Sequence, residues 1–199
     1  IAYSASHKHY CGNSGGFPQT DPWSFYHSTA WTTDARGTNT GDIYGYPDHP
    51  GTPRPELLNW FPQTTPGNFT GTGQAVWTVT GNSDYVIYGG EFPVVNGTRQ
   101  QGLVRYGTRA LAPNKQGPRF SGDAWSFSAK SFSSGEVRVR YQTNWDRDDT
   151  TLTYRVYRDS EASAPISEKT ISTVFWKPQS QTLTDADQQP GSSHRYRVV

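Results

Sequence analysis

The sequence predicts an all-β protein, and three observations support this prediction. Apolar and polar residues alternate in segments such as 136–142 and 151–157, which is the pattern of strands with one buried face. Turn-forming residues separate such segments, and the chain has 20 glycines and 14 prolines. Aromatic residues reach 14% although hydrophobic residues are only 32%, so rings must supply much of the core between short strands.

Strand-like segments of the first half begin at the N-terminus, where residues 1–6 alternate. Further strands are predicted at 74–79, 84–88 and 102–106. The dipeptide Asn96-Gly97 suits a type I′ turn, in which both central residues have positive φ. A single helical turn is predicted around 55–60, because Pro62 would end any longer helix.

The region 17–61 is rich in aromatic residues but has few strand-like runs, and we expect it to be a long insertion. Exposed rings next to Asp, Asn and Gln suit sugar binding, since the apolar face of a pyranose stacks on a ring while its hydroxyls form hydrogen bonds. The candidate carbohydrate-binding residues are Trp23, Trp31, Tyr46 and Trp60. The alternative is that these rings form the core of the insertion itself.

A second domain is predicted after the polar, Pro-containing segment 112–118, which gives domains at 1–118 and 119–199. Strands are expected at 136–142, 151–157, 170–176 and 194–198. Strands of this spacing, separated by turns, indicate a sandwich.

Two resemblances to known families refine the fold class. Residues 88–97 and 101–106 form a strand, a Gly-Gly-x-Phe segment, a Val-Asn-Gly turn and a second strand, which resembles a bacterial β-propeller repeat of the delta-sixty type. Residues 154–159, 183–185 and 190–198 resemble a fibronectin-type-III domain, in which Tyr196 would be a buried core aromatic of the sixth strand. That family implies a seventh strand, which the sequence does not contain.

The resemblances together imply the terminal part of a β-propeller with a long aromatic-rich insertion, followed by an immunoglobulin-like fibronectin-III sandwich. The arrangement resembles secreted actinobacterial proteins in which a propeller precedes a fibronectin-III, polycystic-kidney-disease-like or laminin-G-like module. It implies a secreted, extracellular or cell-surface protein. Both ends of the sequence resemble strands, so we expect a piece of a longer chain with its signal peptide upstream.

Two groups of residues are candidate metal ligands. His7, His9 and Cys11 would share one face of a strand and could bind zinc or copper, whereas the alternative is two polar histidines and a cysteine with a disulfide partner elsewhere. Asp146, Asp148 and Asp149 could bind calcium through carboxylate oxygens, although Arg147 lies among them. The alternative is an ordinary solvated acidic turn.

No catalytic residues are assigned, because the sequence has no nucleophile elbow, zinc-protease motif or phosphate-binding loop. Asp42, Asp48 and Glu91 are the possible carboxylates of a polysaccharide hydrolase. The net charge of +1 and the scattered basic residues argue against nucleic-acid binding, and no apolar stretch is long enough for membrane insertion.

The preferred hypothesis is a non-catalytic protein that binds carbohydrate, such as a glycan or cell-wall polymer, or other cell-surface components. The alternatives are a structural component that self-assembles into an extracellular polymer, and a polysaccharide-acting hydrolase.

Overall fold

The computed structural model describes residues 1–113, 116–186 and 188–199. The chain divides into two compact units, Ile1–Gln116 and Gly117–Val199, which we call unit 1 and unit 2. In the described residues the only helical segments are the short 3₁₀ turns Gly12–Ser14 and Gly122–Ala124. The all-β prediction is therefore confirmed. Within these residues there is no helix of the length and apolarity that crossing a membrane requires.

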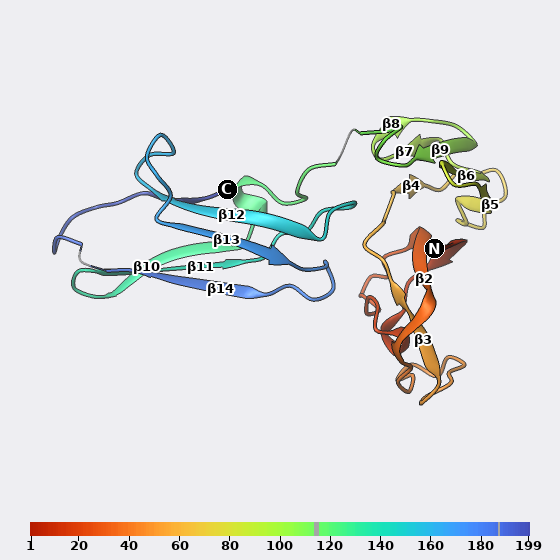
Figure 1. Cartoon of the computed structure of the whole chain (residues 1–199), viewed down its shortest axis with the longest axis horizontal. Coiled ribbons are helices and arrows are strands. Elements are labelled where there is room, and N and C mark those ends of the chain that lie inside the picture. The colour runs from red at the N-terminus through yellow and green to blue at the C-terminus, as the bar shows by residue number, and fades with distance from the viewer. Residues whose placement is uncertain (114–115, 187) are drawn as a thin grey trace. The chain divides into compact units, whose positions relative to one another are not determined.

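Unit 1 contains three antiparallel sheets of three strands each (Figure 1). Their orders are β1 (Ala2–Lys8), β2 (Tyr26–Thr38), β3 (Pro53–Leu57); β4 (Thr64–Thr65), β7 (Val94–Val95), β8 (Thr98–Arg99); and β5 (Val76–Gly81), β6 (Tyr85–Gly90), β9 (Leu103–Gly107). A propeller blade has four strands, and blades close into a ring. The described residues form no four-stranded sheet in this unit, so the structure shows the all-β class without a closed propeller.

The aromatic-rich region 17–61 contains more β-structure than its sequence suggests. The sequence pattern does not reveal the 13-residue strand β2. His27 to Ala30 are all buried, so this strand lacks the alternation of a half-exposed strand. The helical turn predicted at 55–60 is wrong, since β3 occupies Pro53–Leu57. Proline is compatible with β3 because this strand lies at a sheet edge, paired only with β2.

The core of unit 1 depends on aromatic rings. Tyr88 is fully buried among Val76, Val86 and their neighbours. Its ring stacks on Trp60 with a centroid distance of 5.8 Å, and Tyr106 packs edge-on against the same Trp60 at 5.3 Å. The rings pack together with aliphatic side chains such as Val76 and Val86, and each ring adds a large buried apolar area.

The turn at Asn96-Gly97 has the predicted form. Asn96 has a φ of 48° and Gly97 a φ of 79°, and Val95 pairs with Thr98 across the turn. Positive φ at both central positions is the property of a type I′ hairpin. At position 90 glycine is needed for lack of space, because a Cβ there would lie 2.1 Å from the carbonyl oxygen of Ala75.

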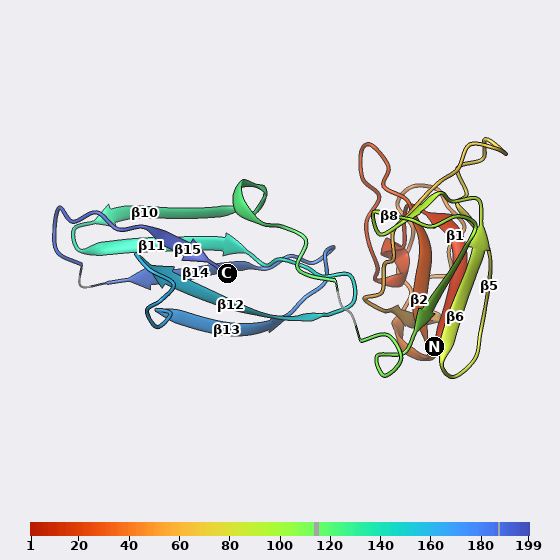
Figure 2. The same ribbon diagram turned by 90° about the horizontal axis from the view of Figure 1, so that it is seen from above.

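Unit 2 is a sandwich of two three-stranded antiparallel sheets (Figure 2). One sheet has the order β10 (Phe127–Ser133), β11 (Glu136–Gln142), β14 (Ser180–Asp185), and the other has β13 (Ser167–Ser172), β12 (Thr151–Arg158), β15 (Tyr196–Val198). The core joins Val139 and Tyr141 of β11 to Tyr154 and Val156 of β12. This two-layer arrangement is compatible with an immunoglobulin-like domain.

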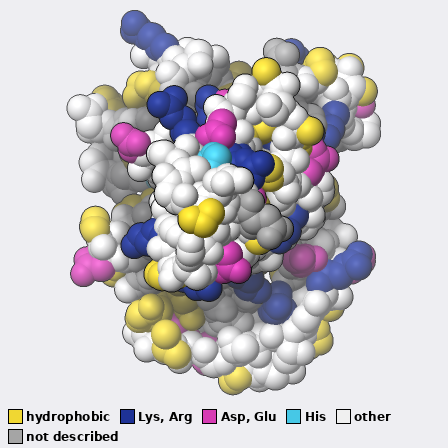
Figure 3. Space-filling view, turned by 90° about the vertical axis from the view of Figure 1, so that its left-hand side faces the viewer, with side chains coloured by type: hydrophobic (Ala, Val, Ile, Leu, Met, Phe, Trp, Pro, Cys, Tyr) yellow, Lys and Arg dark blue, Asp and Glu magenta, His cyan; other side chains and the backbone are white. Residues whose placement is uncertain are grey.

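A carboxylate links the two sheets of unit 2. Asp185 on β14 accepts bonds from Arg158 Nη1 on β12, at 3.0 Å to each oxygen, and from the Tyr196 hydroxyl on β15, at 2.6 Å. A second pair, Arg155 with Glu168 at 2.7 Å, lies on one sheet and is exposed. On the face drawn in Figure 3, basic and acidic side chains are intermixed, with no large area of one sign.

Candidate functional site

Four exposed aromatic side chains of unit 1 form a group with His9, which directly follows β1; three of them contact the imidazole, and Tyr44 contacts Tyr46. They are Trp23, Phe25, Tyr44 and Tyr46, and with His9 we call them the His9 patch. The His9 ring stacks on Trp23 with a centroid distance of 4.2 Å and an angle of 5° between the planes. Phe25 and Tyr46 meet the same imidazole edge-on at 5.7 and 5.6 Å. The patch therefore joins three segments that are far apart in the sequence.

Hydrogen bonds fix the positions of Tyr44 and Tyr46 in the patch. The Tyr46 hydroxyl donates to Gln19 Oε1 at 3.0 Å and lies 3.0 Å from His9 Nε2. Because the hydroxyl has one proton and gives it to Gln19, His9 Nε2 is the donor to Tyr46. The Asp42 carboxylate accepts the backbone N–H groups of Tyr44 and Tyr46 at 2.8 and 2.7 Å. These bonds fix the loop that carries both tyrosines.

The loop before β2 presents the indole of Trp23. Thr20 Oγ1 donates to the carbonyl oxygen of Pro22 at 2.8 Å and accepts the Ser24 N–H at 2.9 Å, which closes a turn around residue 23. The Trp23 side chain is 51% exposed although it stacks on His9. A large ring held in place but open to solvent is suited to stacking on a flat ligand.

The four candidate sugar-binding residues occupy different surroundings. Trp23 and Tyr46 both belong to the His9 patch. Trp31 lies on β2, half-buried, with its indole N–H bonded to Thr29 Oγ1 at 3.0 Å. Trp60 is half-buried and packs against the core of unit 1, where its ring stacks on Tyr88 of β6. The structure thus brings two of the four together.

The other members of the patch were not among the sequence candidates for sugar binding. Phe25 and Tyr44 belong to the same aromatic-rich region, but nothing in the sequence separates them from rings that are buried there, such as Phe17 and Phe61. The sequence suggests His9 as a metal ligand or as a polar residue of a strand. In the structure the His9 ring stacks on Trp23. No local sequence pattern predicts this contact, because the two residues lie in different segments of the chain.

The residues of the predicted group His7, His9 and Cys11 differ in their contacts, although His7 and His9 both lie against the Phe25 ring. His7 Nδ1 is bonded to Gln74 Oε1, His9 stacks on Trp23, and Cys11 is buried. Burial raises the pKa of the Cys11 thiol to about 12, so the thiol is protonated at neutral pH. In the part of the chain that the structure describes, no three His, Cys, Asp or Glu side chains are grouped to hold a metal ion.

The acidic segment before β12 forms a turn. The Asp146 carboxylate is buried and accepts the backbone N–H of Asp148 at 3.0 Å. Asp149 follows within the same turn, and calcium binding by these three residues stays a prediction. The buried Asp146 already has a structural role there.

The three possible catalytic carboxylates, Asp42, Asp48 and Glu91, form hydrogen bonds that stabilise loops. Asp48 Oδ2 accepts the Asp42 N–H at 2.5 Å, so these two belong to one loop. Glu91 lies elsewhere and accepts the Thr70 hydroxyl at 2.6 Å and the Thr70 N–H at 3.0 Å. These hydrogen bonds, chiefly that of the Thr70 hydroxyl, lower the pKa of Glu91. A carboxyl group with a lowered pKa is ionised at neutral pH, whereas a general acid must hold a proton to donate.

Comparison with protein-family models, with curated proteins and with solved structures finds no match to this chain.

Proposed function

We propose that the protein is a non-catalytic extracellular module that binds carbohydrate through the His9 patch. The observation that carries the proposal is a contiguous group of four exposed aromatic side chains, three of which contact the His9 ring. Exposed hydrophobic residues scattered singly are ordinary, whereas a contiguous group marks an interaction surface.

The chemistry of the patch favours a sugar over a purely apolar ligand. The Trp23 indole offers a face on which the C–H groups of a pyranose can stack. The His9, Tyr46 and Gln19 network belongs to the same group of side chains and offers partners for sugar hydroxyls. Because the supporting loops are fixed by internal hydrogen bonds, binding would cost little ordering of the protein.

We further propose the finer architecture that the sequence motifs imply. The sheet orders β10-β11-β14 and β13-β12-β15, with a core between them, support a fibronectin-III-like sandwich for unit 2. The β7–β8 hairpin next to the β5-β6-β9 sheet supports a propeller-derived unit 1. Secretion follows from the same resemblance.

The test compares two tryptophans of equal exposure. Trp23 in the patch is 51% exposed and Trp77 on β5, outside it, is 52% exposed. Co-sedimentation with insoluble cellulose, chitin and peptidoglycan should show binding to at least one polymer. We expect Trp23→Ala to weaken this binding by about tenfold or more and Trp77→Ala to leave it unchanged, because ring stacking is the main contact.

Two results would contradict the proposal. One is that none of the polymers retains the unaltered protein. The other is that Trp23→Ala and Trp77→Ala weaken retention equally, since adsorption would then depend on exposed rings in general and not on the patch.

A further inference from the structure

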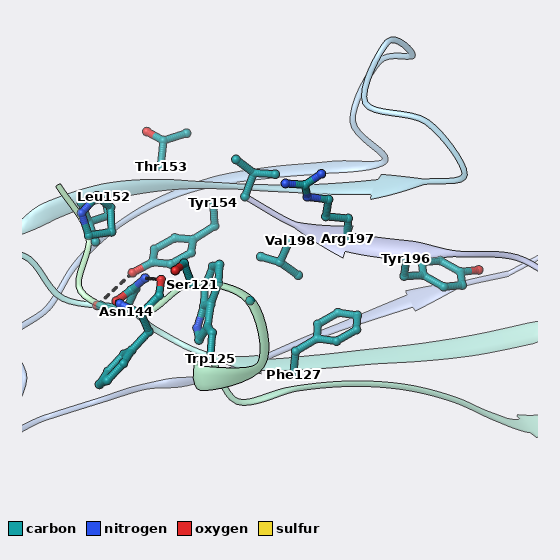
Figure 4. A pocket seen from close by; sticks show the side chains of 14 residues that line it. Ser121, Trp125, Phe127, Asn144, Leu152, Thr153, Tyr154, Tyr196, Arg197 and Val198 are labelled. Carbon is teal, nitrogen blue, oxygen red and sulfur yellow. Dashed lines mark hydrogen bonds between the residues drawn. The ribbon is translucent and has the colours of Figure 1, made fainter.

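In unit 2 the loop after β12 and the segment before β15 meet at one end of this strand pair. Figure 4 shows Tyr196, Arg197 and Val198 of β15 beside β12. Asp159 directly follows β12, and its backbone N–H donates to the carbonyl oxygen of Arg195 at 2.7 Å. In return, Asp159 Oδ1 accepts the Arg195 N–H at 2.9 Å. The two segments are therefore fixed to each other.

Three side chains of these segments form a chain of hydrogen bonds, which we call the Ser192 triad. Asp159 Oδ2 lies 2.9 Å from His194 Nδ1, and His194 Nε2 lies 2.9 Å from Ser192 Oγ. Because an ionised carboxylate only accepts hydrogen bonds, Nδ1 carries the proton and donates to Asp159. Nε2 of the neutral ring is then the acceptor, so the Ser192 hydroxyl donates to it. The order of the groups is that of a nucleophile, a base and an orienting acid.

Asp159 has the backbone conformation and the charge that this chain of hydrogen bonds requires. Its φ of 65° lies in the left-handed region, which aspartate tolerates better than most residues do. The hydrogen bond from His194, followed by that from the Arg195 N–H, lowers the pKa of Asp159, so its carboxylate is ionised at neutral pH. An ionised acceptor at Nδ1 selects the tautomer of His194 in which Nε2 can take a proton.

We propose that Ser192 is a covalent modification site, at which an activated ester transfers its acyl group to the serine hydroxyl. In this step the bond from Oγ to the acyl carbon forms, and the bond from that carbon to the leaving oxygen of the ester breaks. The Oγ proton passes to His194 Nε2 and then to the leaving oxygen, so the neutral imidazole is restored. The ester is the only reactant besides the protein.

The backbone beside Ser192 explains why the acyl group is retained. The Ser192 N–H donates to the carbonyl oxygen of Gln189 at 3.0 Å, and the Arg195 N–H is bonded to Asp159. These two N–H groups therefore do not stabilise the oxyanion that forms when water attacks a serine ester. An activated ester reacts without such donors because its leaving group is good, whereas the serine ester that results is an ordinary alkyl ester.

This inference does not depend on carbohydrate binding, because the Ser192 triad lies in unit 2 and the His9 patch in unit 1. A single transfer to the protein is also compatible with a module that does not turn over a substrate. The pocket drawn in Figure 4 is a separate feature, a space of about 550 Å³ between the sheets that residues such as Trp125 and Tyr154 line. No member of the triad lines that pocket.

The test treats the full chain with p-nitrophenyl acetate and locates the acetyl groups by fragmentation mass spectrometry. The matched control is the neighbouring exposed Ser193, whose hydroxyl forms no side-chain hydrogen bond among the described residues. We expect Ser192 to be acetylated about a hundredfold faster than Ser193, because assistance by a general base typically gives at least a factor of this size. Ser192→Ala should remove this fast reaction, and Ser193→Ala should leave it unchanged.

Asp159→Asn tests the positioning role of the carboxylate. Asparagine tolerates the same positive φ and can still accept the Arg195 N–H. Its amide can also donate to His194 Nδ1, and Nε2 then carries the proton and cannot accept one from Ser192. Nitrogen NMR of the His194 ring should show this change of tautomer, and the acetylation of Ser192 should slow to about the rate of Ser193.

The proposal is overturned if Ser192 is acetylated no faster than Ser193, or if Asp159→Asn leaves either the tautomer or the rate unchanged. It is also overturned by a continued release of nitrophenol that depends on Ser192. In that case the serine is the nucleophile of a hydrolytic reaction and not a site that retains the acyl group.

Discussion

Unit 1 and unit 2 are both built from three-stranded sheets, yet they are stabilised in different ways. In unit 2, regular strands of seven and eight residues, β11 and β12, place Val139, Tyr141, Tyr154 and Val156 in one layer between two sheets. In unit 1, strands as short as two residues are joined by long loops, and ring-to-ring contacts such as Trp60–Tyr88 fill the interior. Both cores combine valines with aromatic rings, so the comparison shows that a β core does not require long regular strands when loops bring rings such as Trp60 against buried valines.

The largest expected effect comes from removing one ring from each core. Tyr154 is 1% exposed in unit 2 and Tyr88 is fully buried in unit 1. Tyr154→Ala and Tyr88→Ala should each lower the free energy of unfolding by about 3–5 kcal/mol, because a large cavity is left. Each loss should be confined to its own unit. Hydrogen exchange with mass spectrometry, followed in increasing urea, measures the two units separately.

The matched control for Tyr154 is Tyr154→Phe, which removes only the hydroxyl bonded to the Asn144 carbonyl oxygen at 3.1 Å. This substitution should lower the free energy of unfolding of unit 2 by about 1 kcal/mol. If Tyr88→Ala and Tyr154→Ala each weaken both units equally, the two cores are not separate, and the comparison fails.

A smaller effect is expected from the carboxylate that links the sheets of unit 2. The side chain of Asp185 is 11% exposed, and Asp185→Ala leaves Arg158 and Tyr196 without their acceptor. We expect a loss of roughly 3 kcal/mol, measured by urea denaturation. Glu168→Ala removes an exposed pair with Arg155 and should cost less than about 1 kcal/mol. If the two substitutions lower the free energy of unfolding equally, the Asp185 link contributes no more to stability than an exposed ion pair does.

The smallest expected effect is a pH dependence confined to unit 1. Burial lowers the pKa of His27 below its ordinary value of 6.5, so the unfolded chain binds a proton more readily than the folded one. The stability of unit 1 should be complete above pH 6.5 and fall as the pH decreases below it. Thermal denaturation between pH 7.5 and about 5 measures this. His27→Gln should flatten the profile of unit 1, and an unchanged slope would exclude His27 as its source.

The predictability of the fold from sequence also differs between the units. The strand predicted at 136–142 is β11, and that at 151–157 is β12 with one more residue, because each has one buried and one exposed face. The strand predicted at 170–176 lies at Ser167–Ser172, since Phe175 and Trp176 belong to the turn that follows. In unit 1, β2 was missed because consecutive buried residues remove the alternation.

The candidate site was predictable only in part. The aromatic region was identified, and two of its four nominated rings, Trp23 and Tyr46, lie in the His9 patch. The sequence could not distinguish them from Trp60, whose ring packs against the core of unit 1. Whether a ring faces solvent depends on contacts between distant segments, and no local pattern encodes those contacts.

Cys11 gives the molecule a built-in chemical reporter. It is the only cysteine of the chain, it is 5% exposed, and its thiol has a pKa of about 12. At pH 8 the buried thiol is almost entirely protonated, so reagents such as maleimides should modify Cys11 only when unit 1 opens. The rate of that modification would time the opening of unit 1, and a cysteine introduced on the surface could be labelled selectively without removing the native one.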